Sequence, residues 1–341
     1  MDYSDYSSYV DNGATYNRVK DLKGVFAFEK FPTYEQMSNF LVDELRIEQI
    51  PYLDRPNIDE SKLSDDQLFW RRQGYLLIRN AIPESLIDAY LAVRVKAGLV
   101  HQGWPSIYAY ESIPEIRELC LYQPLLRRIE KMVGYEIVMA HNLSTFTSSE
   151  RGWHMDDTMA DPPAAASGIG LWYALGDILP ESGPLEFVPG SHRWPILRMH
   201  KVACHLTTEA LYNKEGKYEY WGQLVEYFVN PACDAYLRKR NVTPKVFLPK
   251  KGDVLVMHGA LLHRGSVPTN RDLLRPAIIT QFIDPKRNPW GLQGGKVVRH
   301  SNGQGYVLHP GSSQPSRKGK SLSGLLASFL RKTVKPIVLG R

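Results

Sequence analysis

The spacing of apolar and polar positions along this chain changes near residue 136. Before that point, apolar residues recur at helical intervals behind recognisable helix starts. Thr33 and Ser64 each stand three residues before a glutamine, as in a capping box, and Pro83 suits the first position of a helix. The pattern predicts helices over 33–45, 64–74, 84–96 and 122–134, the last three with a glycine at or just past their ends.

Beyond residue 136 the apolar runs become short and are separated by glycine and proline, which is typical of strands. The runs that predict strands lie at 136–147, 168–178, 184–189, 245–249, 253–258 and 275–283. Helices followed by many short strands predict a mainly β fold with flanking α-helices.

Two histidines and one aspartate form a candidate metal site. His154 and Asp156 are two residues apart, and on an extended segment such residues point to the same side, so both could bind one ion. The third ligand must then come from a neighbouring strand, and His263 or its rival His258 could supply it. Two histidines and a carboxylate can occupy one face of iron(II) and leave its other positions open.

Arg275 is a candidate for binding a carboxylate. It follows His263 by twelve residues, after a turn-rich stretch, and precedes an apolar run at 276–282 that is typical of a buried strand. An arginine in this place can hold a carboxylate through two parallel hydrogen bonds, and the alternative is a surface salt bridge. An iron site beside a carboxylate clamp indicates 2-oxoglutarate as a cosubstrate.

The stretch from Phe69 to about Pro285 resembles the phytanoyl-CoA dioxygenase-like (PhyH) family of Fe(II)/2-oxoglutarate-dependent oxygenases. The segments that carry the resemblance are the entry 69–78, the metal motif 153–157, the aromatic Trp172, the hairpin 181–192 with its Pro-Gly-Ser-His, the distal histidine segment 252–270, and Arg275. No single motif is specific, but the motifs together are, and they extend over roughly two thirds of the chain.

The resemblance implies a fold and a set of roles. The fold is the double-stranded β-helix, the jelly roll of cupin-like proteins. His154, Asp156 and His263 would hold Fe(II), Arg275 would bind 2-oxoglutarate, and O2 would be the oxidant. His263 is favoured over His258, which is then a core histidine or a group behind the ligands.

Three further residues are expected beside the cosubstrate. Trp172 is expected where the family often places an aromatic side chain, although tryptophans on strands are usually core. Ser266 is displaced by one residue from the family pattern, which loosens its role. Some relatives carry a lysine or asparagine upstream of the metal motif. The stretch 142–147 has no lysine, and the hydroxyl of Thr147, or alternatively that of Thr145, is expected to serve instead. Asp157 is expected to point away from Asp156, on the assumption of a strand.

The expected function is a dioxygenase that hydroxylates an unactivated C–H bond of a small organic substrate and releases succinate and CO2. Two alternatives from other classes stay open. One is a cupin-like metal enzyme that does not use 2-oxoglutarate, and the other is a non-catalytic relative that binds a ligand. The pattern does not name the substrate.

Composition and charge bound the organisation of the chain. We expect a flexible N-terminus over 1–25, a single oxygenase domain over 26–310 with its β core at about 136–285, and an aromatic, lid-like insertion at about 196–245. The alternative for the insertion is that its aromatic residues pack a satellite core. Three widely separated cysteines predict a reducing compartment, and we expect a cytoplasmic protein.

The C-terminal tail, 311–341, is basic and amphipathic. Its last 25 residues hold seven lysines and arginines and no acidic residue, so the rest of the chain is nearly neutral although the whole carries a net charge of +6. A nearly neutral body argues against nucleic acid as a partner. The tail itself predicts contact with an anionic membrane surface or with another protein.

Overall fold

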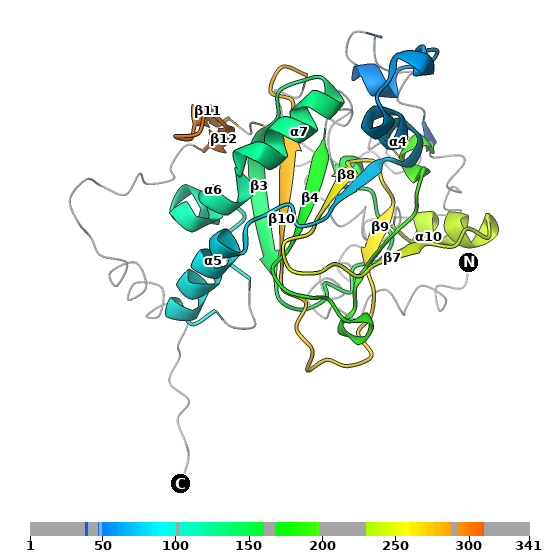
Figure 1. The fold of residues 1–341 in the computed structure, drawn as a ribbon. Coiled ribbons are helices and arrows are strands. Elements are labelled where there is room, and N and C mark those ends of the chain that lie inside the picture. The colour runs from blue at the N-terminus through cyan, green and yellow to red at the C-terminus, as the bar shows by residue number, and fades with distance from the viewer. Residues whose placement is uncertain are drawn as a thin grey trace, which may run out of the picture.

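The computed structural model describes residues 38–39, 47, 50–99, 103–104, 106–159, 168–194, 196–197, 230–287, 292 and 294–309. In this part of the chain two antiparallel sheets face each other, and helices cover the outer face of the larger one (Figure 1). This is the predicted jelly roll with flanking helices, and the fold prediction is confirmed.

The larger sheet has seven strands. Their order, with bounds, is β11 (Lys296–Arg299), β12 (Gly305–Leu308), β3 (Val138–Thr145), β10 (Ala277–Ile283), β4 (Ile169–Ala174), β8 (Val254–His258) and β2 (Tyr75–Ile78). All neighbours pair antiparallel except β12 with β3. Strand β10 therefore lies in the middle of the sheet, between β3 and β4, and the predicted strands of this sheet are all present.

A second, three-stranded sheet consists of β7 (Lys245–Phe247), β5 (Leu185–Phe187) and β9 (His263–Gly265), in that order. A short pair joins β1 (Ser38–Asn39) to β6 (Ile196–Leu197). The strand at Ser38–Asn39 contradicts the predicted helix over 33–45, because pairing with a distant segment outweighs a local capping signal. The other residues of that predicted helix, apart from the two in β1, lie outside the described residues.

The helices begin and end where the capping residues predict. They are α4 (Asp65–Gln73), α5 (Glu84–Lys96), α6 (Pro114–Cys120), α7 (Gln123–Val133) and α10 (Asn230–Lys239). Ser64 and Gln67 form the capping box of α4, and Gly74 ends it in the left-handed region with a φ of 72°. The sequence reading missed α6 and α10. Short 3-10 helices are η3 (Tyr52–Asp54), η4 (Glu60–Lys62), η5 (Ala109–Glu111), η6 (Asp156–Met159), η8 (Pro180–Ser182) and η9 (Ser191–Arg193).

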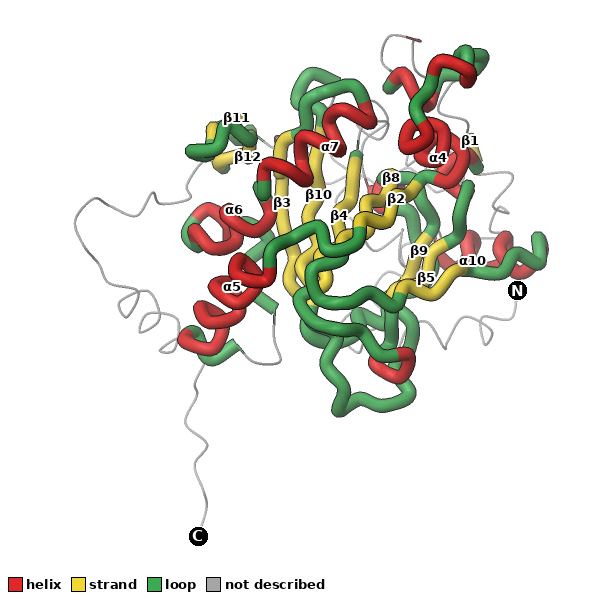
Figure 2. Tube along the Cα trace, viewed as in Figure 1, coloured by secondary structure: helices red, strands yellow, loops and turns green. Residues whose placement is uncertain are grey.

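The two faces of the seven-stranded sheet have different neighbours. On β10, Ile278 and Phe282 pack with residues of α5, α6 and α7, whereas Ala277 and Ile279 pack with residues of the three-stranded sheet. Figure 2 shows the same layers, with these helices on one side and β5 and β9 on the other. Because side chains alternate along a strand, Gln281 shares the inner face with Ala277 and Ile279. The candidate site lies on this inner face.

Several predictions lie outside the described residues. These are the N-terminus over 1–25, the tail over 311–341, and most of the lid-like insertion, of which only 196–197 and 230–245 are described. The single domain over 26–310 stays a prediction. Among the helices that the structure describes, none has the length and apolar character needed to cross a bilayer.

Candidate metal centre

The backbone brings His154 and His263 opposite each other. Each donates its N–H to the carbonyl of the other at 3.0 Å, which forms an isolated antiparallel bridge at the start of β9. Directly opposed residues of such a bridge project their side chains to the same side. The two imidazole rings accordingly lie with their centroids 4.2 Å apart.

A backbone carbonyl fixes the orientation of each imidazole. Nδ1 of His154 lies 2.7 Å from the carbonyl oxygen of Gly152, and Nδ1 of His263 lies 2.9 Å from that of Leu261. Each Nδ1 therefore carries the proton and donates it, which leaves the lone pair of each Nε2 available to a metal ion. This arrangement is typical of metal-ligating histidines.

Asp156 completes the group. Its Oδ1 lies 3.6 Å from Nε2 of His154 and 3.7 Å from Nε2 of His263. Ligands about 2.1 Å from one ion and at right angles are about 3 Å apart, so a shift of a few tenths of an ångström closes the three atoms around an ion. Among the described residues, this is the one group of three His, Cys, Asp or Glu side chains whose ligand atoms converge within 4.8 Å.

The predicted reason for the His-x-Asp spacing was wrong. Asp156 begins the 3-10 helix η6, and His154 belongs to a single bridge, so the two are not alternate residues of one strand. The turn into η6 brings the Asp156 carboxylate back towards the two imidazoles. The expectation that Asp157 points away from Asp156 assumed the same strand, so the structure does not support its reason either.

Gln281 is a site residue that the sequence reading missed. Its Nε2 donates to Oδ2 of Asp156, so the other carboxylate oxygen, Oδ1, faces the histidines. Gln281 lies on β10, six residues after Arg275, which is an even separation along the strand predicted over 275–283. Strand alternation counted from the candidate clamp is the signal that could have found it.

Burial sets the charge state of His154. Burial, reinforced by the positive charge of Arg151 and by His263, lowers the pKa of His154 well below its ordinary value, against the opposing effect of the Gly152 carbonyl. The ring is therefore neutral near neutral pH and can act as a ligand without first losing a proton.

Arg275 is buried on the inner face, with 2% of its surface exposed. Nη1 donates to the Gly183 carbonyl at 3.2 Å and Nη2 to the Thr147 carbonyl at 3.4 Å, but Nε has no partner among the described residues. No carboxylate in the described part of the chain lies within ion-pair distance of it. Burial lowers the pKa of Arg275 to about 10. A buried cation with a free donor fits an anionic ligand, and the predicted alternative of a surface salt bridge is wrong.

The sequence match to known proteins covers this region. The family model of phytanoyl-CoA dioxygenase (PhyH) matches residues 119–273. This part of the chain is thus similar to the phytanoyl-CoA dioxygenase family. A curated relative, phytanoyl-CoA dioxygenase domain-containing protein 1 of Danio rerio, is 26% identical over 140 residues, which are 40% of this chain and 40% of the relative. The match thus covers less than half the length of that relative.

Several solved structures are also similar to this chain. The epimerase SnoN, in complex with Fe3+, alpha ketoglutarate and nogalamycin RO, is 16% identical with a TM-score of 0.47, covering 74% of this chain and 98% of that one. The carbocyclase SnoK from nogalamycin biosynthesis is 19% identical with a TM-score of 0.46, covering 67% and 87%. HygX from Streptomyces hygroscopicus, with nickel and 2-oxoglutarate bound, is 16% identical with a TM-score of 0.44, covering 65% and 86%.

The three residues expected beside the cosubstrate lie around Arg275 in different ways. The ring of Trp172 faces the inner side, with its centroid 5.9 Å from the Arg275 guanidinium carbon. The hydroxyl of Ser266 donates to the Pro184 carbonyl at 2.8 Å and is thus already engaged. Thr147 reaches Arg275 through its backbone carbonyl rather than through its hydroxyl.

The remaining candidates lie behind the ligands. His258, the rival third ligand, has its Nε2 3.3 Å from Oδ2 of Asp54 and is not part of the converging group. Asp157 is buried and packs against Gly259, whose carbonyl accepts its backbone N–H at 2.9 Å. His192 joins the turn over 190–192 to α4, since its Nε2 lies 3.1 Å from the Arg71 carbonyl oxygen.

His141 is a second residue that the sequence reading left without a role. It lies directly opposite Gln281 in the register of β3 and β10, and therefore on the inner face beside Asp156. Burial, together with His309, lowers the pKa of His141 and outweighs the opposing effect of the Asp156 carboxylate. Its imidazole has no hydrogen-bond partner in the part of the chain that the structure describes. A neutral, unpartnered imidazole beside the triad suits contact with a bound molecule.

Proposed function

We propose that this chain is an Fe(II)- and 2-oxoglutarate-dependent dioxygenase that hydroxylates an unactivated C–H bond of a small organic substrate. The observation that supports this most is one combination on the inner face: His154, Asp156 and His263 converge beside a buried Arg275 with an unpartnered Nε. Two histidines and one carboxylate suit Fe(II) and fill three positions, so three others stay open.

The residues of the chain have separate roles in this proposal. His154, Asp156 and His263 hold the metal, and Gln281 keeps Oδ1 of Asp156 turned towards it. Arg275 binds the distal carboxylate of 2-oxoglutarate, which supplies the anion that its buried guanidinium lacks. The Trp172 ring beside it excludes water from that end.

Bound Fe(II) with 2-oxoglutarate would supply O2 activation: one oxygen atom goes to the substrate as a hydroxyl, the other goes to succinate, and CO2 leaves. The chain determines which C–H bond is presented. The inner face on the side of Gln281, opposite the Arg275 end of β10, is where we place the substrate. There, His141 offers a neutral hydrogen-bonding group, and Leu143, 48% exposed, offers an apolar contact.

The test is a titration of the full chain with Fe(II) and then 2-oxoglutarate without oxygen, followed by the weak visible charge-transfer band of a chelated 2-oxoglutarate. Air is then admitted and succinate is measured. We expect the band and succinate in the wild type. We expect neither in His263→Ala, and a band only at far higher 2-oxoglutarate in Arg275→Met.

His300→Asn is a matched control, because His300 also lies near a carboxylate, at 3.2 Å from Glu118, but belongs to the opposite edge of the seven-stranded sheet. It should behave as the wild type does. Bound iron with no band and no succinate would refute the proposal and favour a metal enzyme that does not use 2-oxoglutarate. Absence of metal binding would favour a non-catalytic ligand-binding protein.

A further inference from the structure

The turn that carries the third metal ligand is held by a set of specific contacts. Residues 258–262 connect β8 to β9, and the Leu261 carbonyl in this turn orients His263 through its Nδ1 at 2.9 Å. The N–H of Leu261 donates to the His258 carbonyl at 2.8 Å, and the N–H of Leu262 donates to Oγ of Ser191 at 2.8 Å. The position of the His263 ring therefore depends on the conformation of this turn.

The ring of His258 forms one of these contacts. Its Nδ1 accepts the backbone N–H of Ala260 at 3.0 Å, within the turn. A ring nitrogen that accepts a hydrogen bond carries no proton, so the proton of a neutral His258 is on Nε2. Nε2 lies 3.3 Å from Oδ2 of Asp54, which accepts that proton's hydrogen bond. Asp54 thus selects the tautomer that the turn requires.

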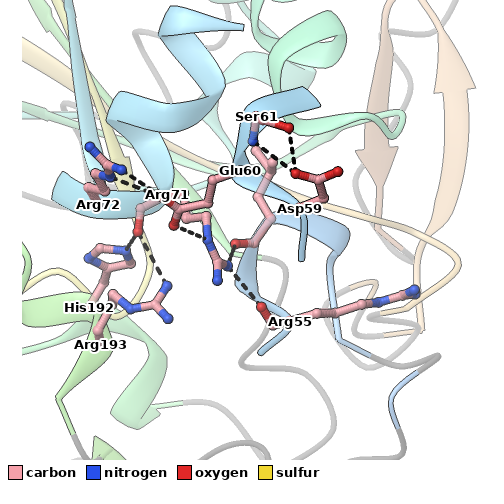
Figure 3. Close-up of polar contacts among 9 residues, drawn as sticks. Arg55, Asp59, Glu60, Ser61, Arg71, Arg72, His192 and Arg193 are labelled. Atoms are coloured by element: carbon pink, nitrogen blue, oxygen red, sulfur yellow. Dashed lines mark hydrogen bonds and ion pairs between the residues drawn. The ribbon is translucent and has the colours of Figure 1, made fainter. Parts of the chain in front are cut away.

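Asp54 is itself held in place by Arg71, a residue of α4 with 6% of its surface exposed. Nη1 of Arg71 donates to the carbonyls on either side of Asp54, those of Leu53 at 2.6 Å and Arg55 at 2.8 Å. Nε of Arg71 donates to Glu60 at 3.0 Å, as Figure 3 shows together with His192 and Arg193 around the Arg71 carbonyl. The carboxylate that faces His258 is therefore fixed from both sides along the chain.

We propose that Asp54 and His258 are positioning residues for the metal centre: Asp54 holds the Nε2-protonated tautomer of His258, whose Nδ1 fixes the turn that orients His263. They act through the backbone and touch neither the ion nor the substrate. This rests on the proposed function, because it assigns a role to residues behind the proposed Fe(II) ligands. It extends the site to the segment 52–55, outside the matched family region.

Other charged groups also face this pair. Burial and Arg193 lower the pKa of His258, but Asp54 and Asp157 outweigh them, so it is raised overall. The ring centroid of His192 lies 5.1 Å from that of His258. Burial raises the pKa of Asp54, but the neighbouring His258, His192 and Arg193 outweigh that effect, so the pKa is lowered overall. The Asp54 carboxylate is therefore ionised near neutral pH and can keep its role as acceptor.

Two substitutions of His258 separate the two functions of its ring. In His258→Asn the side-chain oxygen takes the place of Nδ1 and can accept the Ala260 N–H, but the contact with Asp54 is lost. In His258→Gln the terminal amide takes the place of Nε2 and can donate to Asp54, but the acceptor for Ala260 is lost. Each protein is titrated with Co(II) alone, followed by its visible absorption, and its thermal unfolding is measured.

We expect His258→Gln to bind Co(II) about 10- to 100-fold more weakly than the wild type, the usual effect of removing a group behind a metal ligand, and His258→Asn to bind within about threefold of it. His300→Asn should be unchanged. Equal Co(II) affinity of the wild type and His258→Gln would overturn the proposal, as would equal losses in both His258 variants. No Co(II) binding by the wild type would instead refute the proposed function.

The tautomer provides a test that needs no variant to fold. In the wild-type protein with 15N-labelled histidine, long-range 1H–15N spectra report which ring nitrogen carries the proton. The His258 signals are identified as those missing from the spectrum of His258→Asn, or by sequential assignment if that variant does not fold. We expect a bare Nδ1 and a protonated Nε2 at neutral pH. A proton on Nδ1 of His258 would overturn the proposal, because Nδ1 could not then accept the Ala260 N–H.

Discussion

Replacing Arg275 with methionine should weaken the binding of 2-oxoglutarate and, at the same time, make the free protein more stable. In the free protein, burial lowers the pKa of Arg275 from its ordinary value to about 10, a shift that corresponds to about 3 kcal/mol of destabilisation. Since the folded-state pKa is the lower one, the whole penalty is present below pH 10 and is relieved only above it. The free protein at neutral pH therefore carries a buried cation at a net cost.

The hydrogen bonds of Arg275 to the Gly183 and Thr147 carbonyls offset part of this cost. They are long, at 3.2 and 3.4 Å, and are worth about 1 kcal/mol each. Methionine fills similar space without charge, so Arg275→Met should leave the free protein about 1 kcal/mol more stable. For 2-oxoglutarate, the variant loses two charge-assisted hydrogen bonds of at least about 1.5 kcal/mol each, which is a loss of affinity of about 100-fold or more.

The assay is chemical denaturation of each free protein, together with the rise in melting temperature caused by 2-oxoglutarate in the presence of Co(II). Arg287→Met is the matched control, because Arg287 is an arginine already paired, with Asp284, whose side chain is only 4% exposed. That variant should lose stability, since it leaves a buried carboxylate unpaired, and should keep its response to 2-oxoglutarate. A free Arg275→Met protein several kcal/mol less stable, with an unchanged response to 2-oxoglutarate, would refute the clamp.

Three further predictions test the surroundings of the site. Gln281→Leu should weaken Co(II) binding about tenfold, because Asp156 loses the hydrogen-bond donor that orients it. A Co(II) titration of a second variant, Gln281→Glu, would show whether the donor matters. Gly259→Ala should cost about 1–3 kcal/mol in chemical denaturation, because a Cβ there collides with the Asp157 carboxylate, and Asp157→Ala should relieve much of that cost. Burial raises the pKa of Asp253, but hydrogen bonds from Asn80, Lys250 and Arg79 outweigh it and lower the pKa overall, so the ionised carboxylate stabilises the fold above pH 3.8 and this effect is lost as pH falls through the lower folded pKa. The difference in unfolding free energy between the wild type and Asp253→Asn should therefore shrink in that acid range. A difference that stays constant with pH would contradict this reading.

Local signals in the sequence predicted the helices well because their causes are local. The capping box at Ser64 and the left-handed glycine at Gly74 involve residues within one turn of the chain, and both ends of α4 lie where they indicate. The signal at Thr33 has the same form, yet Ser38–Asn39 is a strand, because its partner at Ile196–Leu197 is far away in the sequence. Capping signals carry no information about such partners.

The metal ligands and Arg275 were found from their residue types and order, whereas Gln281, His141 and Asp54 were missed. Gln281 and His141 matter because they are opposed in the register of β10 and β3, which depends on strand pairing between segments far apart in the sequence. Asp54 lies 204 residues from His258, and nothing in the local sequence connects the two. The prediction that His154 and Asp156 lie together rested on a strand that is in fact a bridge followed by a 3-10 helix.

The central position of β10 explains why the clamp and the triad must form together. The family match ends at residue 273, two residues before Arg275, so neither Arg275 nor Gln281 is part of it. Yet β10 pairs with β3 on one side and β4 on the other, and its inner face carries Gln281 towards Asp156 while the N–H of Arg275 donates to the Phe146 carbonyl at 2.8 Å. A chain that lacked β10 would leave β3 and β4 each without a neighbour on one side, and it would lose the donor to Asp156 together with the segment that follows Arg275. We therefore expect the proposed metal binding and carboxylate binding to be coupled through one strand, so that damage to the pairing of β10 reduces both.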